Sequence, residues 1–337
     1  MSERTETSQS AGSPPQDVEQ PHFLSQVAKL AKTAQFYWYL SHVFAIFFMA
    51  LSTIISVFKG NITYSAIRYY QLSITSIIIT YLIVIRQTYR EKPITFLFSQ
   101  FFRLIGDDNI QYLLLASVLR FFASRIYGGI NATTLQPFTI FALFHSLLYF
   151  QSMILPFLSP LSASTKQKIS SGIQSFVEKY NETSLMVASN MELMTALTYS
   201  VQTLILIVTM RIFRSNLFAT NLKTICMCVS YVTFCKIRYD QSRYMQTLIN
   251  SYDMRFNQFI YGSRFVPQSL KGILVQVRSF IISVMKRISL PVTQPTQNRN
   301  WKSFSNFEYF LYRWQNPSCM DAVEYFIFGK VRISSTP

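Results

Sequence analysis

Long apolar runs separated by polar segments dominate the chain between residues 36 and 235. The first run, residues 36–58, contains no charged residue, and as a helix it would be about 34 Å long, enough to cross the hydrocarbon core of a bilayer. Residues 66–85 form a second run, with Arg68 and Arg86 placed to extend toward the two interfaces. The pattern therefore predicts a helical protein that crosses its membrane several times.

Four further apolar runs follow, but several contain charged residues that disfavour lipid. These runs cover residues 110–127, 137–158, 191–212 and 217–235. Their charged residues are Arg120, Arg125, Glu192 and Lys223. Each would cost about 2.5–3.5 kcal/mol at the centre of a membrane helix, so short or re-entrant helices are an alternative to complete spans. We expect an all-α polytopic membrane protein with about four to six membrane helices.

Composition and charge agree with a protein that resides in a bilayer. Half of the 337 residues are apolar and only 14% are charged, against roughly 25% in an ordinary soluble domain. The formal charge of +16 would suit nucleic acid, anionic lipid or an acidic protein, so the positions of the charges must decide. If the N-terminus is cytosolic and there are six spans, 24 of the 31 Lys and Arg residues fall on the cytosolic side. This asymmetry predicts that both termini are cytosolic.

The sequence divides into four parts. Residues 1–24 are polar and rich in Ser and Pro, which predicts a disordered cytosolic tail without a secretory signal peptide. Residues 25–235 form the expected multi-pass membrane domain, and residues 236–291 form a basic cytosolic region. Residues 292–337 are an aromatic extension whose pattern indicates no role.

Residues 268–290 have the spacing of an amphipathic helix. Eight apolar residues fall within an arc of about 120°, although Val275 and Ile282 depart from it. The stripe consists of Leu270, Ile273, Leu274, Val277, Ile281, Val284, Met285 and Ile288. The basic residues of this helix are Lys271, Arg278, Lys286 and Arg287. They could meet anionic lipid at about 1 kcal/mol per charge while the stripe enters the membrane interface. The helix could instead occupy a partner's groove or pack against the protein's own cytosolic side.

The stretch before this helix, residues 236–264, is rich in Arg and Tyr. Its arginines, Arg238, Arg243, Arg255 and Arg264, could bind phosphates. Lipid headgroups or an acidic protein suit a basic region beside a membrane, so we expect no direct binding of nucleic acid. Cys235, at the end of the last apolar run, could be palmitoylated or could be a buried free thiol.

No motif for catalysis is present: the chain lacks a P-loop, GxGxxG, HExxH and a nucleophile elbow. We therefore expect no catalytic residue, no metal and no cofactor. His42 and His145 could meet as a proton relay, but packing or an interhelical hydrogen bond is the favoured interpretation. Glu192 and Arg120 could neutralise each other or line a polar path, but helix packing is the favoured interpretation. A small transporter or channel that uses Glu192 and Arg120 is the alternative to a non-enzymatic role. Asp107 and Asp108 precede a helical run, where they would act as caps.

Four segments carry a family resemblance. They are DDNIQYLLLASVL from Asp107, FALFHSLLYF from Phe141, SNMELMTA from Ser189 and YVTFCKIRYDQSRYMQTLI from Tyr231. Together they resemble the transmembrane protein 33 family of endoplasmic reticulum and nuclear-envelope proteins, which includes fungal tetra-spanning proteins and pore-membrane nucleoporins. The resemblance covers roughly residues 25–291 and includes His145 and Glu192.

This resemblance implies residence in the endoplasmic reticulum membrane and the nuclear envelope. It implies roles in membrane organisation and in the assembly or distribution of nuclear pore complexes. It also implies nucleoporins, reticulon-type proteins and a nuclear import receptor as partners, the last only through the helix at 268–290. The family is described with four spans and the apolar runs indicate six, but both counts are even and place the termini on one side.

Overall fold

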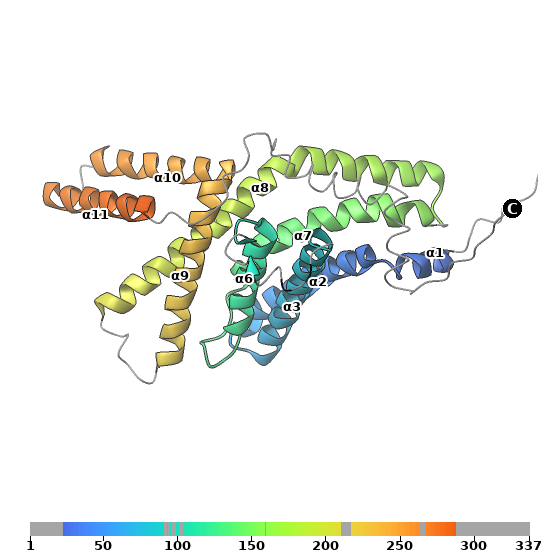
Figure 1. The fold of residues 1–337 in the computed structure, drawn as a ribbon, viewed down its shortest axis with the longest axis horizontal. Helices are drawn as coiled ribbons and strands as arrows, with labels where there is room; N and C mark the ends of the chain where they lie inside the picture. Colours follow the sequence, from blue (N-terminus) through green and yellow to red (C-terminus); the bar gives the residue numbers. More distant parts are fainter. Residues whose placement is uncertain are drawn as a thin grey trace, which may run out of the picture. The chain divides into compact units, whose positions relative to one another are not determined.

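The computed structural model describes residues 23–90, 93, 95, 99–100, 104–158, 160–209, 217–262 and 267–287. In this part of the chain every named element is a helix, as Figure 1 shows, which confirms the expected all-α class. The elements are α1 (Phe23–Leu30), α2 (Ala34–Lys59), α3 (Tyr64–Thr88), α6 (Asp108–Phe121), η1 (Ala132–Leu135), α7 (Gln136–Tyr149), η2 (Phe150–Ile154), η3 (Leu155–Phe157), α8 (Ala163–Val208), α9 (Phe218–Gln241), α10 (Arg243–Gly262) and α11 (Gln268–Arg287). The predicted tail before residue 23 and the aromatic extension lie outside the described residues.

Five helical segments of the described chain are long and apolar enough to cross a membrane. They are Ala34–Lys59, Tyr64–Thr88, Ala132–Phe157, Ala163–Val208 and Phe218–Gln241. This number lies within the expected range of four to six. The predicted span at 110–127 is wrong in its length, because α6 has 14 residues, about 21 Å, and ends at Phe121. The chain then turns through a hairpin closed by an isolated bridge between Ser124 and Gly129.

Although α6 is short, it runs antiparallel to α3 from one end of that helix toward the other. At the start of α6, the Tyr89 hydroxyl donates to Asp107 Oδ2 at 2.9 Å. Beyond its end, Gln71 Nε2 donates to the carbonyl oxygen of Ala123 at 2.6 Å. Residues 71 to 89, which run from α3 to its C-cap, cover about 27 Å, so the segment containing α6 extends over most of a bilayer's hydrocarbon thickness. Asp107 also caps α6 by accepting the backbone N–H of Asn109, as expected.

Helices α2 and α3 form a tight hairpin because small residues lie between them. Ser52 donates to the carbonyl of Ala66 at 3.0 Å, and Ser73 donates to the carbonyl of Ala45 at 2.8 Å. Each hydroxyl thus reaches the backbone of the opposite helix, which requires a close approach of the two helices. Gly60, with a φ of 88°, ends α2 and allows the chain to reverse.

Helix α8 contains 46 residues and begins at Ala163, so it extends well before the apolar run expected at 191–212. Ser162 caps the helix by accepting the N–H of Thr165. The polar first half packs on the end of α7 and on η2: the rings of Phe144 and Phe176 lie 5.8 Å apart. Hydropathy reveals only the apolar second half of α8, because the first half carries charged residues, including Lys166, Lys168, Glu178 and Lys179.

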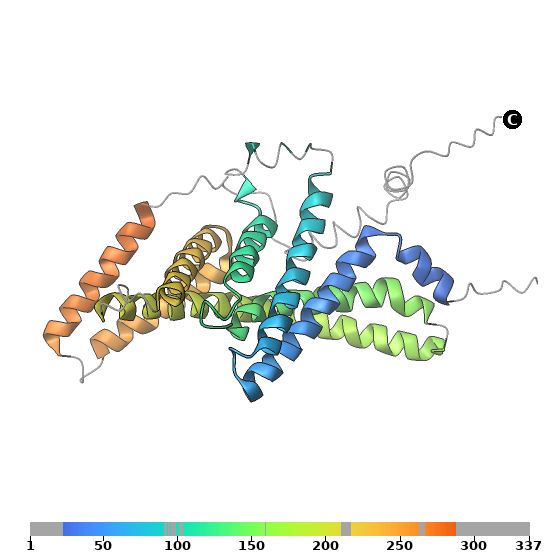
Figure 2. The same ribbon diagram turned by 90° about the horizontal axis from the view of Figure 1, so that it is seen from below.

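Helix α9 joins the two ends of the bundle. Near its start, Lys223 Nζ donates to the carbonyl of Gly129 at 2.6 Å. Near its end, Arg238 forms an ion pair with Asp108 at the start of α6. The helix continues to Gln241, past the expected domain boundary after residue 235, and leads through Ser242 into α10 (Figure 1). Figure 2 shows the same helices from below, with α11 in orange.

Candidate functional site: the α10–α11 arm and a buried polar cluster

One side of α11 exposes a continuous row of apolar side chains, which we name the exposed stripe. Its members and their exposed fractions are Leu270 (45%), Ile273 (55%), Val277 (49%), Phe280 (69%) and Ile281 (51%). At 100° per residue these five positions occupy an arc of about 100°. The predicted amphipathic helix is therefore present, and no residue of α11 in the described part of the chain is fully buried.

A second side of α11 is partly covered. Its half-buried residues are Lys271, Leu274, Val275, Arg278, Ile282 and Met285. Leu274 and Met285 were predicted to belong to one stripe with Val277 but lie on this covered side. Val275 and Ile282, which departed from the predicted stripe, also belong here. The side chains of Val284 and Lys286, and all of Ile288, lie outside the described residues.

An ion pair between the two helices holds α11 beside α10. Arg278 Nε donates to Asp253 Oδ1 and Arg278 Nη2 donates to Asp253 Oδ2, both at 2.6 Å. These hydrogen bonds hold the pKa of the Asp253 carboxyl below its ordinary value. Arg278, which was expected to meet lipid headgroups, thus binds a carboxylate of the protein in the bidentate geometry that suits a guanidinium. Among the predicted basic residues, Lys271 is partly exposed and Arg287 is exposed.

The third side of α11 carries mostly short uncharged polar residues. Its exposed members include Gln268, Ser269, Gly272, Gln276, Ser279 and Ser283. This side separates the covered side from the exposed stripe and suits contact with water.

Helix α10 is fixed to the membrane helices. The Tyr252 hydroxyl donates to Asn190 Oδ1 of α8 at 2.7 Å. Met245 and Ile260, near its two ends, are completely buried. We name α10 and α11 together the arm. Of the four arginines expected to bind phosphates here, Arg243 and Arg255 are exposed, whereas Arg264 lies outside the described residues.

The fourth arginine, Arg238, belongs to a buried polar cluster around Glu192. Glu192 is 1% exposed, and its Oε1 accepts a hydrogen bond of 2.6 Å from the Tyr112 hydroxyl. The guanidinium of Arg238 lies over the Tyr112 ring, 5.5 Å from its centroid, and pairs with Asp108 at 3.1 Å. Its side chain is only 11% exposed, so the expectation that it binds phosphates is wrong. Tyr112 thus lies between a carboxylate and a guanidinium and contacts both.

The structure does not bring Glu192 and Arg120 together. Arg120 lies two helical turns beyond Tyr112 on α6, and its Nε donates to Thr75 Oγ1 of α3 at 3.4 Å. The two residues therefore do not form a neutralising pair: the nearby cation is Arg238, whose charge attracts that of Glu192.

His42 and His145 do meet, with ring centroids 5.3 Å apart. Trp38 packs on both of them, at 4.6 Å from His42 and 5.4 Å from His145. This aromatic environment supports the packing interpretation, and we assign neither histidine a catalytic role. Within the residues that the structure describes, no group of His, Cys, Asp or Glu could hold a metal ion.

Cys235 is a buried thiol. It is 6% exposed, and its Sγ lies 3.9 Å from the carbonyl oxygen of Glu192. Attachment of a palmitoyl chain would require this part of α9 to separate from α8, so the structure favours the unmodified thiol.

Sequence reasoning missed two members of these sites. Tyr112 was not considered as a partner of Glu192, although it lies one turn after Asp108 and within a family-like segment. Phe280 was omitted from the predicted stripe, although it follows Val277 and Ile273 at helical spacing. No sequence signal pairs Tyr112 with Glu192, because the two residues are 80 positions apart.

Comparison with known proteins supplies the family. A family model described as "Transmembrane protein 33/Nucleoporin POM33" matches residues 17–286. The "Pore and endoplasmic reticulum protein of 33 kDa" of Saccharomyces cerevisiae is 27% identical over 263 residues, covering 76% of this chain and 92% of that protein. "Nucleoporin POM33" of Chaetomium thermophilum is 26% identical over 76% of this chain and 87% of its own length. "Tetra-spanning protein 1" of Schizosaccharomyces pombe is 25% identical over 77% and 86% respectively.

No solved structure matches the chain at a significant level. The family match covers the membrane helices, the buried cluster and α11 up to residue 286. The chain is a multi-pass helical membrane protein and belongs to the transmembrane protein 33/nucleoporin POM33 family.

Proposed function

We propose that this chain is a non-enzymatic protein of the endoplasmic reticulum membrane and nuclear envelope, and that it acts in membrane organisation and in the assembly or distribution of nuclear pore complexes. The relatives named for the pore and the endoplasmic reticulum support this role. Counted with the α6 segment, which follows α3 from one end to the other, the five long helices give six crossings. With six crossings the distribution of Lys and Arg supports cytosolic termini, which would place the arm beside the cytosolic membrane surface. Nucleoporins and reticulon-type proteins are the expected partners.

The observation that carries the mechanism is the exposed stripe of α11. Complete burial of such side chains contributes about 1.5–3 kcal/mol each, so moving their exposed halves into lipid would contribute about 1 kcal/mol per residue. Lys271 and Arg287 could each add about 1 kcal/mol on an anionic surface. We infer that α11 lies in the membrane interface with this stripe turned toward the acyl chains.

The arm supports this mechanism because it restricts the orientation of α11. The Arg278–Asp253 pair and the half-buried side of α11 fix which side remains exposed. A nuclear import receptor is the alternative occupant of the stripe, and a pair of matched variants separates the two. The small transporter or channel is not advanced, because Glu192 and Arg120 contact different partners.

The test uses full-length protein with two matched triple variants. In the stripe variant, Ile273→Asp, Val277→Asp and Phe280→Asp place three charges on the exposed stripe. In the control, Gln276→Asp, Ser279→Asp and Ser283→Asp place the same three charges on the polar side of the same helix. An environment-sensitive fluorophore on Cys introduced at Ile281, in a background without the native cysteines, reports insertion into vesicles containing phosphatidylserine.

We expect blue-shifted emission for the control and the parent protein and solvent-exposed emission for the stripe variant. In cells, a tagged stripe variant and a chain truncated after Tyr261 should lose a punctate nuclear rim and keep the endoplasmic reticulum signal. Equal emission from both triple variants would refute membrane insertion by the stripe. Loss of import-receptor binding without a change in emission would instead assign the stripe to the receptor.

A further inference from the structure

The end of the bundle opposite the arm carries basic residues without carboxylates. Lys59, Arg125 and Lys223 lie at this end, since α2 ends there, the α6–η1 hairpin turns there and α9 begins there. The sequence has no Asp or Glu from residue 20 to 90, 109 to 177 or 193 to 239. The α2–α3 loop, the α6–η1 hairpin and the start of α9 therefore bring no acidic residue that could neutralise the positive charge at this end.

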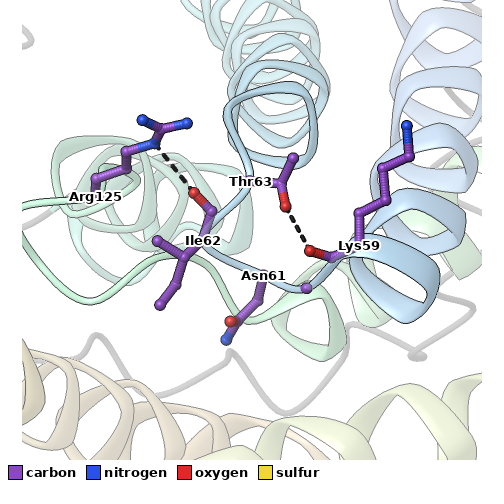
Figure 3. Close-up of a pocket in the computed structure, with 6 residues that line it drawn as sticks. Lys59, Asn61, Ile62, Thr63 and Arg125 are labelled. Atoms are coloured by element: carbon purple, nitrogen blue, oxygen red, sulfur yellow. Dashed lines mark hydrogen bonds between the residues drawn. The ribbon is translucent and has the colours of Figure 1, made fainter.

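Two of these basic residues line a pocket of about 460 Å³. Its walls are Lys59, Gly60, Asn61, Ile62, Thr63 and Arg125. Figure 3 shows the Lys59 amine and the Arg125 guanidinium at opposite edges of the loop that joins α2 to α3. Gly60 has a φ of 88°, and a Cβ on it would meet no other atom within 4 Å, so the loop is open at this point.

The pocket is fixed by hydrogen bonds between two segments far apart in the sequence. Ile130 N–H donates to the carbonyl of Asn61 at 3.2 Å, and Asn61 Nδ2 donates to the carbonyl of Ile130 at 3.2 Å. Arg125 Nε donates to the carbonyl of Ile62 at 3.1 Å, and its guanidinium lies over the Tyr64 ring. Gly129 permits this contact, because a Cβ there would lie 2.7 Å from the Asn61 carbonyl oxygen. The guanidinium is therefore oriented before any ligand binds.

Exposed apolar residues surround the basic pocket. They are Val57 (74%), Phe58 (81%), Ile62 (54%), Tyr64 (66%) and Ile126 (75%). A soluble anion needs no such surface, whereas a lipid brings a phosphate and acyl chains together. We propose that this pocket binds the phosphate group of an anionic phospholipid at the membrane surface opposite the arm. The ligand chemistry is a phosphate ester that accepts hydrogen bonds from a guanidinium and an ammonium group.

The test measures lipid selectivity of the full-length protein in phosphatidylcholine nanodiscs by electron paramagnetic resonance. The probes are phosphatidic acid and phosphatidylcholine spin-labelled on an acyl chain. Lys59→Gln and Arg125→Gln should each lower the preference for phosphatidic acid by about fivefold, which corresponds to about 1 kcal/mol per charge. Arg68→Gln is the control, because it removes an exposed charge from the first turns of α3 that does not line the pocket.

A loss confined to the two pocket variants supports the proposal. An equal loss for Arg68→Gln overturns it in favour of a diffuse field, and so does unchanged selectivity in the pocket variants. Removal of the preference by millimolar inorganic phosphate overturns lipid as the source and assigns the pocket to a soluble phosphate. If Arg125→Gln does not fold, Lys59→Gln decides alone. Its fold should be intact, because Lys59 contributes its backbone carbonyl to the loop, as the acceptor of a hydrogen bond from Thr63 Oγ1, and the substitution keeps that carbonyl.

Discussion

Replacing Tyr112 with Phe tests the buried polar cluster with the removal of a single oxygen. The Tyr112 hydroxyl donates to Glu192 Oε1 at 2.6 Å, and Glu192 Oε2 has no hydrogen-bond partner among the described residues. Phe would keep the aromatic ring beside Arg238 and remove this donor. Hydrogen bonds to charged groups contribute about 1.5–3 kcal/mol, so Tyr112→Phe should destabilise the protein by about that amount.

The same substitution in a Glu192→Gln background gives the second measurement. In this background the Tyr112 hydroxyl would donate to a neutral amide, and a hydrogen bond between neutral groups contributes only about 0.5–1.5 kcal/mol to stability. The two effects should therefore differ by about 1–1.5 kcal/mol, which is the coupling between the Tyr112 hydroxyl and the Glu192 charge. Tyr81→Phe is the matched control, because Tyr81 stacks on Tyr112 with ring centroids 5.8 Å apart, while the hydrogen bond to Glu192 Oε1 comes from Tyr112.

The assay is thermal unfolding of purified protein in detergent, followed by intrinsic fluorescence. For a chain of this size, 1 kcal/mol corresponds to roughly 2–4 °C, so Tyr112→Phe should lower the Tm by about 3–12 °C. The Glu192→Gln background should reduce this shift by about half or more. Equal shifts in both backgrounds, or a shift for Tyr81→Phe as large as that for Tyr112→Phe, would refute the assignment of the cluster.

Three further substitutions test other contacts. Gly129→Ala should lower the Tm more than Gly60→Ala. Both substitutions place a Cβ on a residue with positive φ, which costs about 1–2 kcal/mol, but only the Cβ at position 129 would also clash with the Asn61 carbonyl oxygen. Equal Tm shifts would contradict this. The pKa of Asp253 is held below its ordinary value, so the Arg278–Asp253 pair should persist at neutral pH and be lost as pH falls through that lowered pKa. Spin labels at positions 254 on α10 and 276 on α11 should then show a broader distance distribution in acid. The Asp253→Asn variant should show the same broadening at neutral pH. An unchanged distribution would show that the Arg278–Asp253 pair does not hold the two helices together. With Cys235 as the sole cysteine, maleimide should react only after unfolding in SDS, and rapid labelling of folded protein would show that the thiol is accessible.

Hydropathy predicted the membrane helices well where the helix itself faces lipid. The uncharged run at 36–58 lies within Ala34–Lys59, and the run at 66–85 lies within Tyr64–Thr88. It failed for the first half of α8, which is polar and packs partly on α7, and for the end of the run at 110–127, where Gly128 and Gly129 adopt positive φ values in a hairpin. Periodicity located α11, because its exposed side is not masked by tertiary contacts.

The partners of charged residues could not be predicted from charge and order alone. Charge alone offers Arg120 as one possible partner of Glu192, yet the hydrogen-bond donor is Tyr112, 80 residues away in the sequence. Arg278 was expected to face lipid, yet Asp253, 25 residues earlier, binds it. In both cases the choice depends on how helices pack around the residue, which one sequence does not reveal.

The arrangement of the buried cluster has a consequence for the order in which the chain is assembled. Helices α2 and α3 are joined by a short loop and bond through local hydroxyls, so their hairpin can form before the rest of the bundle is synthesised. When Glu192 is made, Tyr112 has already been synthesised, but Arg238 follows 46 residues later. Glu192 therefore enters the membrane with its hydroxyl donor available and its cation still missing. During that interval α8 should depend on α6, and a chain arrested between these residues would expose an intramembrane carboxylate to the machinery that inspects new membrane proteins.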